Sequence, residues 1–200
     1  NGARVAARWA RDRTDGTAFM IDTPAGTRRA VIRDDDAVTV EMGVPSFEPR
    51  DVPLARETPL VDEPVAGLSV TAVDPGVPHA VAVVDDVDDV DLDEVAPPVR
   101  HDDVFPEGAN VTLASRAGDR HFRQRTFERG VEGETRSCGT GAVAVGAVAR
   151  RLGLIDGDDP VTVSPPGGDL EIRVPEGGAA TLTGPVAYEY SGELEAAPET

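Results

Sequence analysis

The only cysteine of the chain, Cys138, lies in a Ser-Cys-Gly-Thr-Gly sequence that leads into a run of small apolar residues, 142–149. Residues 150–153 supply two arginines and a glycine, which suit the last turn and the end of a helix. Cys138 is therefore expected just before a buried helix, where unpaired backbone N–H groups lower the pKa of a thiol from about 8.5 toward neutrality. Glycines at 139 and 141 would leave those N–H groups open to a small anion. The stretch predicts a reactive thiolate beside a bound carboxylate.

A lone cysteine can also be an ordinary small buried residue, so the surrounding sequence matters. Residues 128–141 read Glu-Arg-Gly-Val-Glu-Gly-Glu-Thr-Arg-Ser-Cys-Gly-Thr-Gly. This string resembles the second active-site motif of diaminopimelate epimerases, which invert an amino-acid centre without a cofactor. The resemblance extends over nearly the whole chain and is strongest at 105–141.

The first residues of the chain resemble the end of the first motif of the same family, Cys-Gly-Asn-Gly-x-Arg. The match places Asn1 and Gly2 on the Asn-Gly of that motif. The motif's cysteine would lie two positions before Asn1, outside this chain. We therefore expect the sequence to be a truncated record, and this chain alone to be unable to carry out two-base epimerisation.

The resemblance also implies roles for single residues. It makes Cys138 one of two proton-transferring groups, Glu128 the carboxylate that moves its proton, and His79 an aid to the other cysteine. Substrate-binding positions that it implies are Asn1, Gly2, Asn110, Arg129, Gly139 and Thr140. Without the resemblance, His79 reads as a structural histidine, Asn110 as a turn residue and Glu128 as an exposed acid at a strand end. Val77 replaces the asparagine usual in the family, which puts one contact to the distal end of the substrate in doubt.

Removing a proton from an amino-acid α-carbon requires stabilisation of a poor carbanion. The chain has no lysine for a pyridoxal phosphate Schiff base, since all 19 basic residues are arginines. Base and acid on opposite faces of the carbon, with dipoles around the carboxylate, meet the demand without a cofactor. No metal site is expected either, because the acidic run 85–94 lacks the spacing of a calcium loop.

The charge balance, 19 − 37 = −18, is extreme for 200 residues. A surface of this kind is typical of a cytoplasmic protein from a salt-accumulating organism, because salt screens its self-repulsion. Nucleic acid and anionic membranes are unsuitable partners for such a charge. The expected partner is a small-molecule substrate, diaminopimelate, and the sequence is compatible with a homodimer.

The pattern of apolar segments predicts an α+β fold with two pseudo-symmetric lobes, each a strand-rich sheet around a central helix, the first lobe being incomplete. We place a remnant of the first lobe at 1–43, the second lobe at 44–186, and a return strand with an acidic tail at 187–200. The first helix, 1–13, is expected to turn Val5 and Trp9 to a core. Expected strands are 17–22, 27–33, 37–42, 68–73, 80–84, 111–114, 120–128, 161–164, 170–174, 180–182 and 186–190.

Three functions remain open at this stage. The first is interconversion of LL- and meso-diaminopimelate in lysine or cell-wall precursor synthesis. The second is a proline or hydroxyproline racemase of similar fold. Its substrates lack a distal amino-acid end, so Arg129 and Asn110 would have no substrate group to bind. The third is a non-catalytic relative that keeps the fold.

Overall fold

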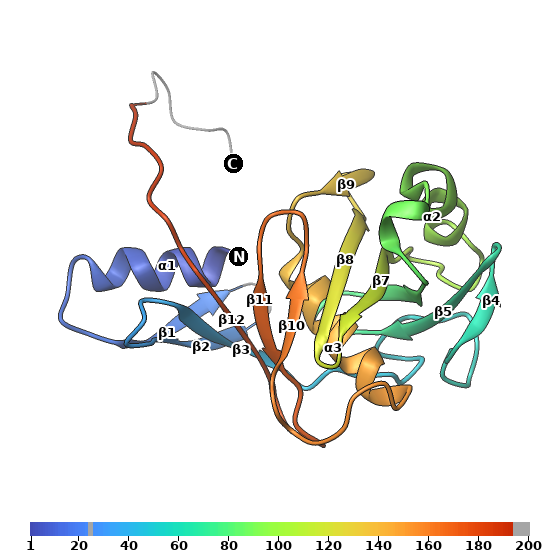
Figure 1. Ribbon diagram of the computed structural model, residues 1–200, viewed down its shortest axis with the longest axis horizontal. Helices are drawn as coiled ribbons and strands as arrows, with labels where there is room; N and C mark the ends of the chain where they lie inside the picture. Colours follow the sequence, from blue (N-terminus) through green and yellow to red (C-terminus); the bar gives the residue numbers. More distant parts are fainter. Residues whose placement is uncertain (24–25, 194–200) are drawn as a thin grey trace.

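One continuous path of β-strands organises the computed structural model, which describes residues 1–23 and 26–193 (Figure 1). The strand order is β1-β2-β3-β12-β11-β10-β8-β7-β6-β5-β4, with β9 paired to β8. Neighbours are antiparallel except for β8 with β10 and β6 with β7. The strands are β1 (Ala18–Thr23), β2 (Gly26–Ile32), β3 (Val38–Gly43), β4 (Glu63–Val65), β5 (Leu68–Val73), β6 (His79–Val83), β7 (Asn110–Gly118), β8 (His121–Glu128), β9 (Gly133–Thr135), β10 (Val161–Ser164), β11 (Leu170–Arg173) and β12 (Ala180–Gly184).

The predicted α+β class is confirmed. Within the described ranges the helices are α1 (Gly2–Arg11), α2 (Leu92–Arg100), α3 (Gly139–Arg151) and the short 3-10 helix η1 (Val87–Asp89). β3 pairs with β12 where the two predicted lobes meet. The lobe boundaries at 43/44 and 186/187 remain predictions.

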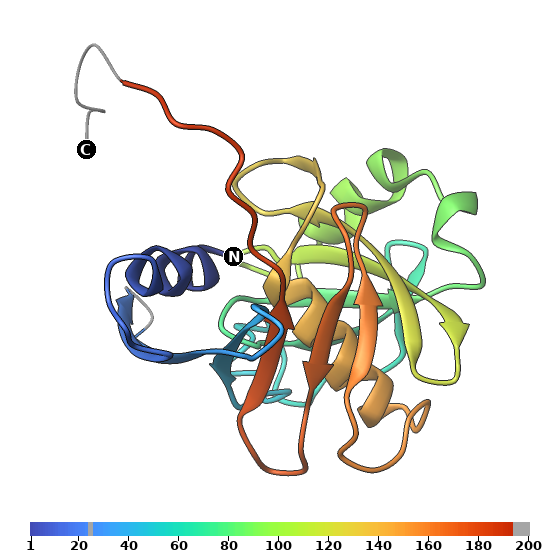
Figure 2. The same ribbon diagram turned by 60° about the vertical axis from the view of Figure 1, so that its left-hand side comes forward.

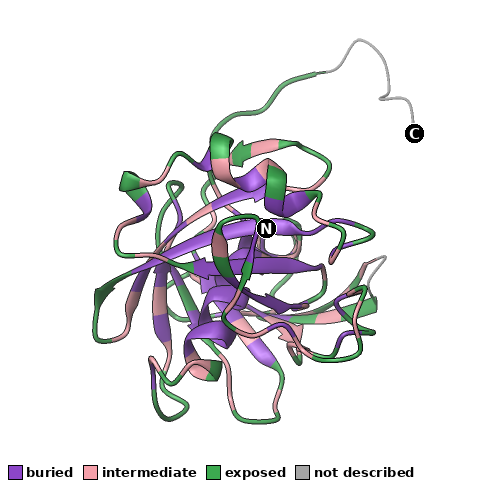
Figure 3. Cartoon of the chain, turned by 90° about the vertical axis from the view of Figure 1, so that its right-hand side faces the viewer, coloured by how far each residue is buried: buried purple, intermediate pink, exposed green. Residues whose placement is uncertain are grey.

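Helix α3 is enclosed by the sheet, as the apolar run 142–149 predicts (Figures 2 and 3). Alanines and valines on every side of the helix contact strands β5 to β8 and β10 to β12. Small side chains let the strands approach closely; a Cβ atom at Gly146 would lie 3.0 Å from Ile172 Cγ2. Burial on all sides, rather than intrinsic helix propensity, stabilises this valine-rich helix.

The opposite face of β5 to β8 forms a second core under α2. Strand residues that alternate with the inward ones, such as Val111 and Leu113, pack there against Leu92, Ala96 and Val99. The sequence did not indicate α2, whose Pro97 and Pro98 lie inside the helix. Strands β4 and β9 are three residues each and were also not predicted.

Helix α1 packs on β1, β2 and β3, but not with the predicted side chains. Val5 is 56% exposed and Trp9 59% exposed, whereas Arg4 and Ala7 are buried, so the expected core-facing role of Val5 and Trp9 is wrong. Arg4 and Ala7 lie on one stripe of the helix, and that stripe faces the strands. Val5 and Trp9 instead border a hollow of about 340 Å³ beside residues 186–188.

The strand predicted at 186–190, which was to return to the first lobe, is also wrong. Residues 185–193 have no strand pairing, and Tyr188 and Tyr190 are both more than 80% exposed. The segment that does return to β3 is β12, directly before it. Residues 24–25, which join the strands predicted at 17–22 and 27–33, and most of the predicted acidic tail lie outside the described residues.

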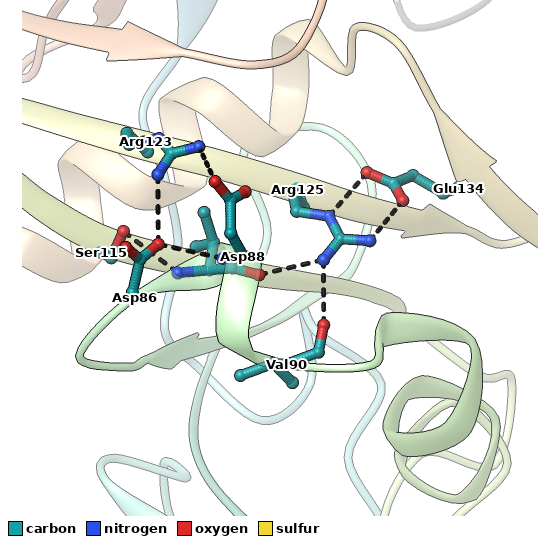
Figure 4. Close-up of polar contacts among 8 residues, drawn as sticks. Asp86, Asp88, Val90, Ser115, Arg123, Arg125 and Glu134 are labelled. Carbon is teal, nitrogen blue, oxygen red and sulfur yellow. Dashed lines mark hydrogen bonds and ion pairs between the residues drawn. The ribbon is translucent and has the colours of Figure 1, made fainter.

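Two arginines that point outward from β8 fasten the neighbouring loop and strand (Figure 4). Arg123 donates to the carboxylates of Asp86 and Asp88 around η1. Arg125 donates to both carboxylate oxygens of Glu134 on β9 and to the carbonyls of Val87 and Val90. These contacts fix β9, and with it the loop that leads to Cys138.

Candidate active site

Cys138 lies at the start of α3, as the sequence predicts. It is the N-cap residue, with an extended backbone (φ −113°, ψ 104°), and its Sγ accepts a hydrogen bond from the Gly141 N–H at 3.4 Å. The Thr140 hydroxyl is also 3.4 Å from Sγ. The residue is 7% exposed, so the sulfur is held by the helix start and largely covered by protein.

The predicted lowering of the thiol's pKa is wrong. Burial raises the pKa of Cys138 above its ordinary value, and the nearby Glu128 carboxylate raises it further by repulsion and by accepting a hydrogen bond. Contacts from Thr140 and Gly141 act in the opposite direction and lower the pKa less than burial raises it. At neutral pH Cys138 is therefore a thiol in this structure, ready to donate a proton rather than to accept one.

Glu128 ends β8 beside this thiol, and its carboxylate accepts a hydrogen bond from the Thr135 hydroxyl. Its predicted proximity to Cys138 agrees with its action on the thiol's pKa. Because Glu128 and Thr135 lie on the paired strands β8 and β9, the hairpin geometry fixes the carboxylate. Its catalytic role remains a prediction.

Replacing Glu128 by glutamine should lower the pKa of the Cys138 thiol. Removing the negative charge makes ionisation easier, so the thiolate should form at lower pH by about one unit. The ¹³Cβ resonance of the single cysteine, followed against pH, measures this directly. Glu171→Gln, which removes an exposed carboxylate on β11, is the control and should leave the titration in place. An unchanged or raised midpoint in Glu128→Gln would show that the carboxylate does not act on the sulfur.

His79 is completely buried at the start of β6, beneath the first turn of α3. Its Nε2 is 3.0 Å from the Thr140 hydroxyl, and its Nδ1 is 3.0 Å from the Thr112 hydroxyl. Burial lowers the pKa of His79 to about 3, with the positive charge of Arg129 adding to the effect. His79 is thus a neutral imidazole joined to Cys138 through Thr140, and its predicted aid to another cysteine stays a proposal.

Asn110 and Arg129 lie next to one another on the side of His79. The Asn110 Oδ1 accepts from the Arg129 backbone N–H at 2.8 Å, and its Nδ2 donates to the Pro78 carbonyl at 3.1 Å. The Arg129 guanidinium uses Nη1 for the carbonyls of Glu107 and Gly108. The Asn110 amide is thus already engaged by the protein, and substrate binding by these two residues remains a prediction.

The two helix starts that the sequence places at Asn1 and Cys138 lie against one another. Asn1 Nδ2 donates to the Ser137 carbonyl at 3.2 Å, and a Cβ atom at Gly139 would lie 3.5 Å from Asn1 Oδ1. Buried Arg4 donates to that Oδ1 at 2.8 Å and to the Pro185 carbonyl at 3.2 Å. Gly2 forms the first turn of α1, beside these contacts. Binding of a substrate carboxylate by Asn1, Gly2, Gly139 and Thr140 is still a prediction.

Gly141 does not leave its N–H open to a ligand, contrary to the expectation, because that N–H donates to the Cys138 sulfur. A Cβ atom there would lie 2.6 Å from Gln124 Nε2 and 3.1 Å from Thr126 Oγ1, so the glycine makes room for side chains of β8. Sequence reasoning missed both of these residues. A signal was present, since β8 alternates, and the buried positions that follow Phe122 carry the polar residues Gln124 and Thr126.

The sequence profile described as "Diaminopimelate epimerase" matches residues 71–189, more than half of the chain. A diaminopimelate epimerase of Methanocella arvoryzae is 46% identical over 179 residues, which cover 88% of this chain and 62% of the relative. One from Xanthomonas axonopodis pv. citri is 44% identical over 202 residues, covering 96% of this chain and 70% of the relative. The chain belongs to the diaminopimelate epimerase family. It spans somewhat less than two thirds of the length of the Methanocella protein.

Solved structures show the same fold at low identity. A hydroxyproline epimerase from Agrobacterium vitis has a TM-score of 0.63 at 20% identity, covering 94% of this chain and 63% of the other. A predicted epimerase from Pseudomonas aeruginosa has a TM-score of 0.63 at 16% identity, covering 96% of this chain and 72% of the other. The fold is therefore common to the diaminopimelate epimerase family and to other epimerases.

No helix in residues 1–23 and 26–193 has the length and apolar character that a bilayer crossing requires. Over the same ranges, no three His, Cys, Asp or Glu side chains gather as metal ligands would. The acidic run 85–94 is instead used in part by the arginines of β8.

Proposed function

We propose that this protein interconverts LL- and meso-2,6-diaminopimelate by proton transfer at the α-carbon, without a cofactor, in lysine biosynthesis. The observation that carries the proposal is the Cys138 thiol at the start of a buried helix, with the Glu128 carboxylate acting on it. Membership of the diaminopimelate epimerase family supports the same substrate.

The chemistry assigned to Cys138 follows from its protonation state. As a thiol, it donates its proton to one face of the substrate carbanion, while a base on the other face has removed the original proton. The thiolate left behind is stabilised by the Gly141 N–H and the Thr140 hydroxyl, and the Glu128 carboxylate can take up a proton from solvent and pass it to the sulfur. The other base is expected from the cysteine that the family's first motif places two residues before its Asn-Gly. Backbone N–H groups at both helix starts would hold the reacting carboxylate.

The substrate's distal amino-acid end distinguishes the two epimerase candidates. A guanidinium binds a carboxylate in a bidentate pair, and within the described residues Arg129 uses only Nη1 in its contacts with carbonyls. Proline and hydroxyproline have no distal carboxylate for Arg129. We therefore favour diaminopimelate over a proline or hydroxyproline racemase, although the hydroxyproline epimerase from Agrobacterium vitis has the same fold. A cytoplasmic, salt-adapted protein is proposed from the charge of −18.

The test is exchange of solvent deuterium into the α-position of diaminopimelate by the full-length protein at high salt. Proton NMR should show loss of the α-proton signal and appearance of the other stereoisomer. L-proline and trans-4-hydroxy-L-proline are run in parallel and should show no exchange. Exchange with these and not with diaminopimelate would favour the racemase, and exchange with none of them would favour a non-catalytic relative.

A further inference from the structure

A chain of buried hydrogen bonds runs under the first turn of α3 and ends at the Cys138 sulfur. Its members come from β8, β7, β6 and α3, and successive polar atoms are 2.9–3.4 Å apart. In order they are Gln124, Thr126, Thr112, His79, Thr140 and Cys138. Each hydroxyl in the middle of such a chain donates on one side and accepts on the other, and a neutral imidazole donates through one ring nitrogen and accepts through the other. The whole chain therefore has a direction, and one fixed member determines it.

Gln124 is that fixed member. Its Nε2 is 3.2 Å from the Cys138 carbonyl oxygen and 2.9 Å from Thr126 Oγ1. A carbonyl oxygen only accepts, so the group that faces it must be the amide NH₂ and not the amide oxygen. The second hydrogen of the same NH₂ then points to Thr126. Gly141 makes this position available, because a side chain there would occupy the place of Nε2.

Gln124 fixes which atom donates in each of the hydrogen bonds that follow. Thr126 accepts from Gln124, and within the described residues its hydroxyl hydrogen has one acceptor, Thr112 Oγ1 at 3.1 Å. Thr112 must then donate to His79 Nδ1 at 3.0 Å. With Nδ1 accepting, the neutral imidazole carries its hydrogen on Nε2.

The last two steps reach the sulfur. The Nε2–H of His79 donates to Thr140 Oγ1 at 3.0 Å, and the Thr140 hydroxyl then donates to Cys138 Sγ at 3.4 Å. The sulfur's own proton has a better acceptor in the Glu128 carboxylate than in a hydroxyl. The contacts of Gln124 at one end of this series of hydrogen bonds and of Cys138 at the other thus require the same donor-to-acceptor direction.

One contact opposes this assignment. Asn110 Nδ2 is 3.4 Å from His79 Nε2 and would favour an unprotonated Nε2. That distance is long for a hydrogen bond, and the same Nδ2 donates to the Pro78 carbonyl at 3.1 Å. The reverse direction would leave the buried Thr126 hydroxyl hydrogen without an acceptor among the described residues, which costs more than a loose contact between two donors. The direction set by Gln124 prevails.

We propose that Gln124 is a positioning residue that holds His79 in the Nε2–H form and so keeps the Thr140 hydroxyl as a donor to the Cys138 sulfur. Only the catalytic consequence, a better stabilised thiolate, rests on the proposed function. The hydrogen-bond direction stands on the geometry of the buried side chains alone. The burial of a glutamine whose Oε1 has no partner within the described residues agrees with a role beyond packing.

The test is the tautomer of His79, read by ¹⁵N NMR on the uniformly labelled chain. The resonance is assigned by its loss in His79→Gln, since the chain has three histidines. The expected wild-type pattern is a protonated Nε2 and a free Nδ1. Gln124→Glu replaces the NH₂ that faces Thr126 with a carboxyl oxygen that accepts. The Thr126 hydroxyl should then donate to residue 124, and the reversal of the following hydrogen bonds should shift His79 to the Nδ1–H form. Thr183→Val, which removes another buried threonine hydroxyl, is the matched control and should keep the wild-type tautomer.

A second reading is the pH titration of the single cysteine by its ¹³Cβ resonance. Loss of the Thr140 donor in Gln124→Glu should raise the midpoint by about one pH unit, with Glu128 unchanged beside the sulfur. Neither reading needs turnover, so a failure here is separate from a failure of the proposed function. A wild-type His79 already in the Nδ1–H form, or a Gln124→Glu variant that keeps Nε2–H, would overturn the inference. If Gln124→Glu does not fold, as judged by its amide spectrum, the tautomer of His79 in the wild-type protein still decides the direction.

Discussion

Cys138→Ala in the full-length protein is expected to abolish deuterium exchange into diaminopimelate, with a loss of about a thousandfold or more. General acid–base groups contribute about 10²–10⁴-fold, and no neighbouring side chain of similar acidity can replace a buried thiol. The residual rate should not return at higher substrate concentration, because the missing step is proton transfer and not binding. The measurement is the rate of loss of the α-proton signal by NMR.

The matched variant for this experiment is Thr183→Val, which changes a buried residue on β12 outside the candidate site. It should keep most of the exchange activity. Cys138→Ala should also keep its thermal midpoint within a few degrees, since the substitution removes one small side-chain atom. Exchange at the wild-type rate in Cys138→Ala would remove this sulfur from the mechanism.

The pH dependence of folding stability should carry a large contribution from His79. Its pKa is about 3 in the folded protein, against 6.5 ordinarily, so below about pH 6.5 the unfolded chain binds a proton that the folded chain does not. Above that pH neither state holds the proton, and as the pH falls from about 6.5 to about 4 the folded state should lose about 3 kcal/mol through this group. Urea denaturation at a series of pH values measures the slope.

His79→Gln removes this titration and should flatten the stability profile over that pH range, whatever its stability at neutral pH. Other groups, including the many carboxylates, titrate equally in both proteins, so the difference between the two profiles isolates His79. His121→Gln, on strand β8, is the control and should keep the wild-type slope. Parallel profiles for wild type and His79→Gln would mean that the imidazole is protonated as easily when folded as when unfolded.

The sequence was informative where local pattern and burial agree. The all-round apolar run 142–149 predicted α3, and the Cys-Gly-Thr-Gly turn placed Cys138 at its N-terminus. The alternating strands around these elements were also predicted within a few residues. Their signals are local, so neighbouring residues alone determine them.

The features that were missed depend on contacts between distant parts of the chain. The pKa of Cys138 is set by burial and by Glu128 across a hairpin, which the helix-start argument could not weigh. Gln124 gains its partners only when β8 lies under α3. Helix α2 forms over two prolines because its apolar face covers the outer side of the sheet. Val5 and Trp9 were expected in the core because helical periodicity indicates that a helix has an apolar face. It does not indicate which face of the helix packs on the sheet.

The pairing of β3 with β12 has a consequence for how the protein is made. During synthesis, β3 emerges from the ribosome long before residues 180–184. One edge of β3 therefore has unpaired backbone N–H and C=O groups until β12 is made. Such an edge invites pairing with other nascent chains. Slowing translation between β3 and β12 should therefore lower the yield of native protein, and a chaperone that shields β3 should raise it.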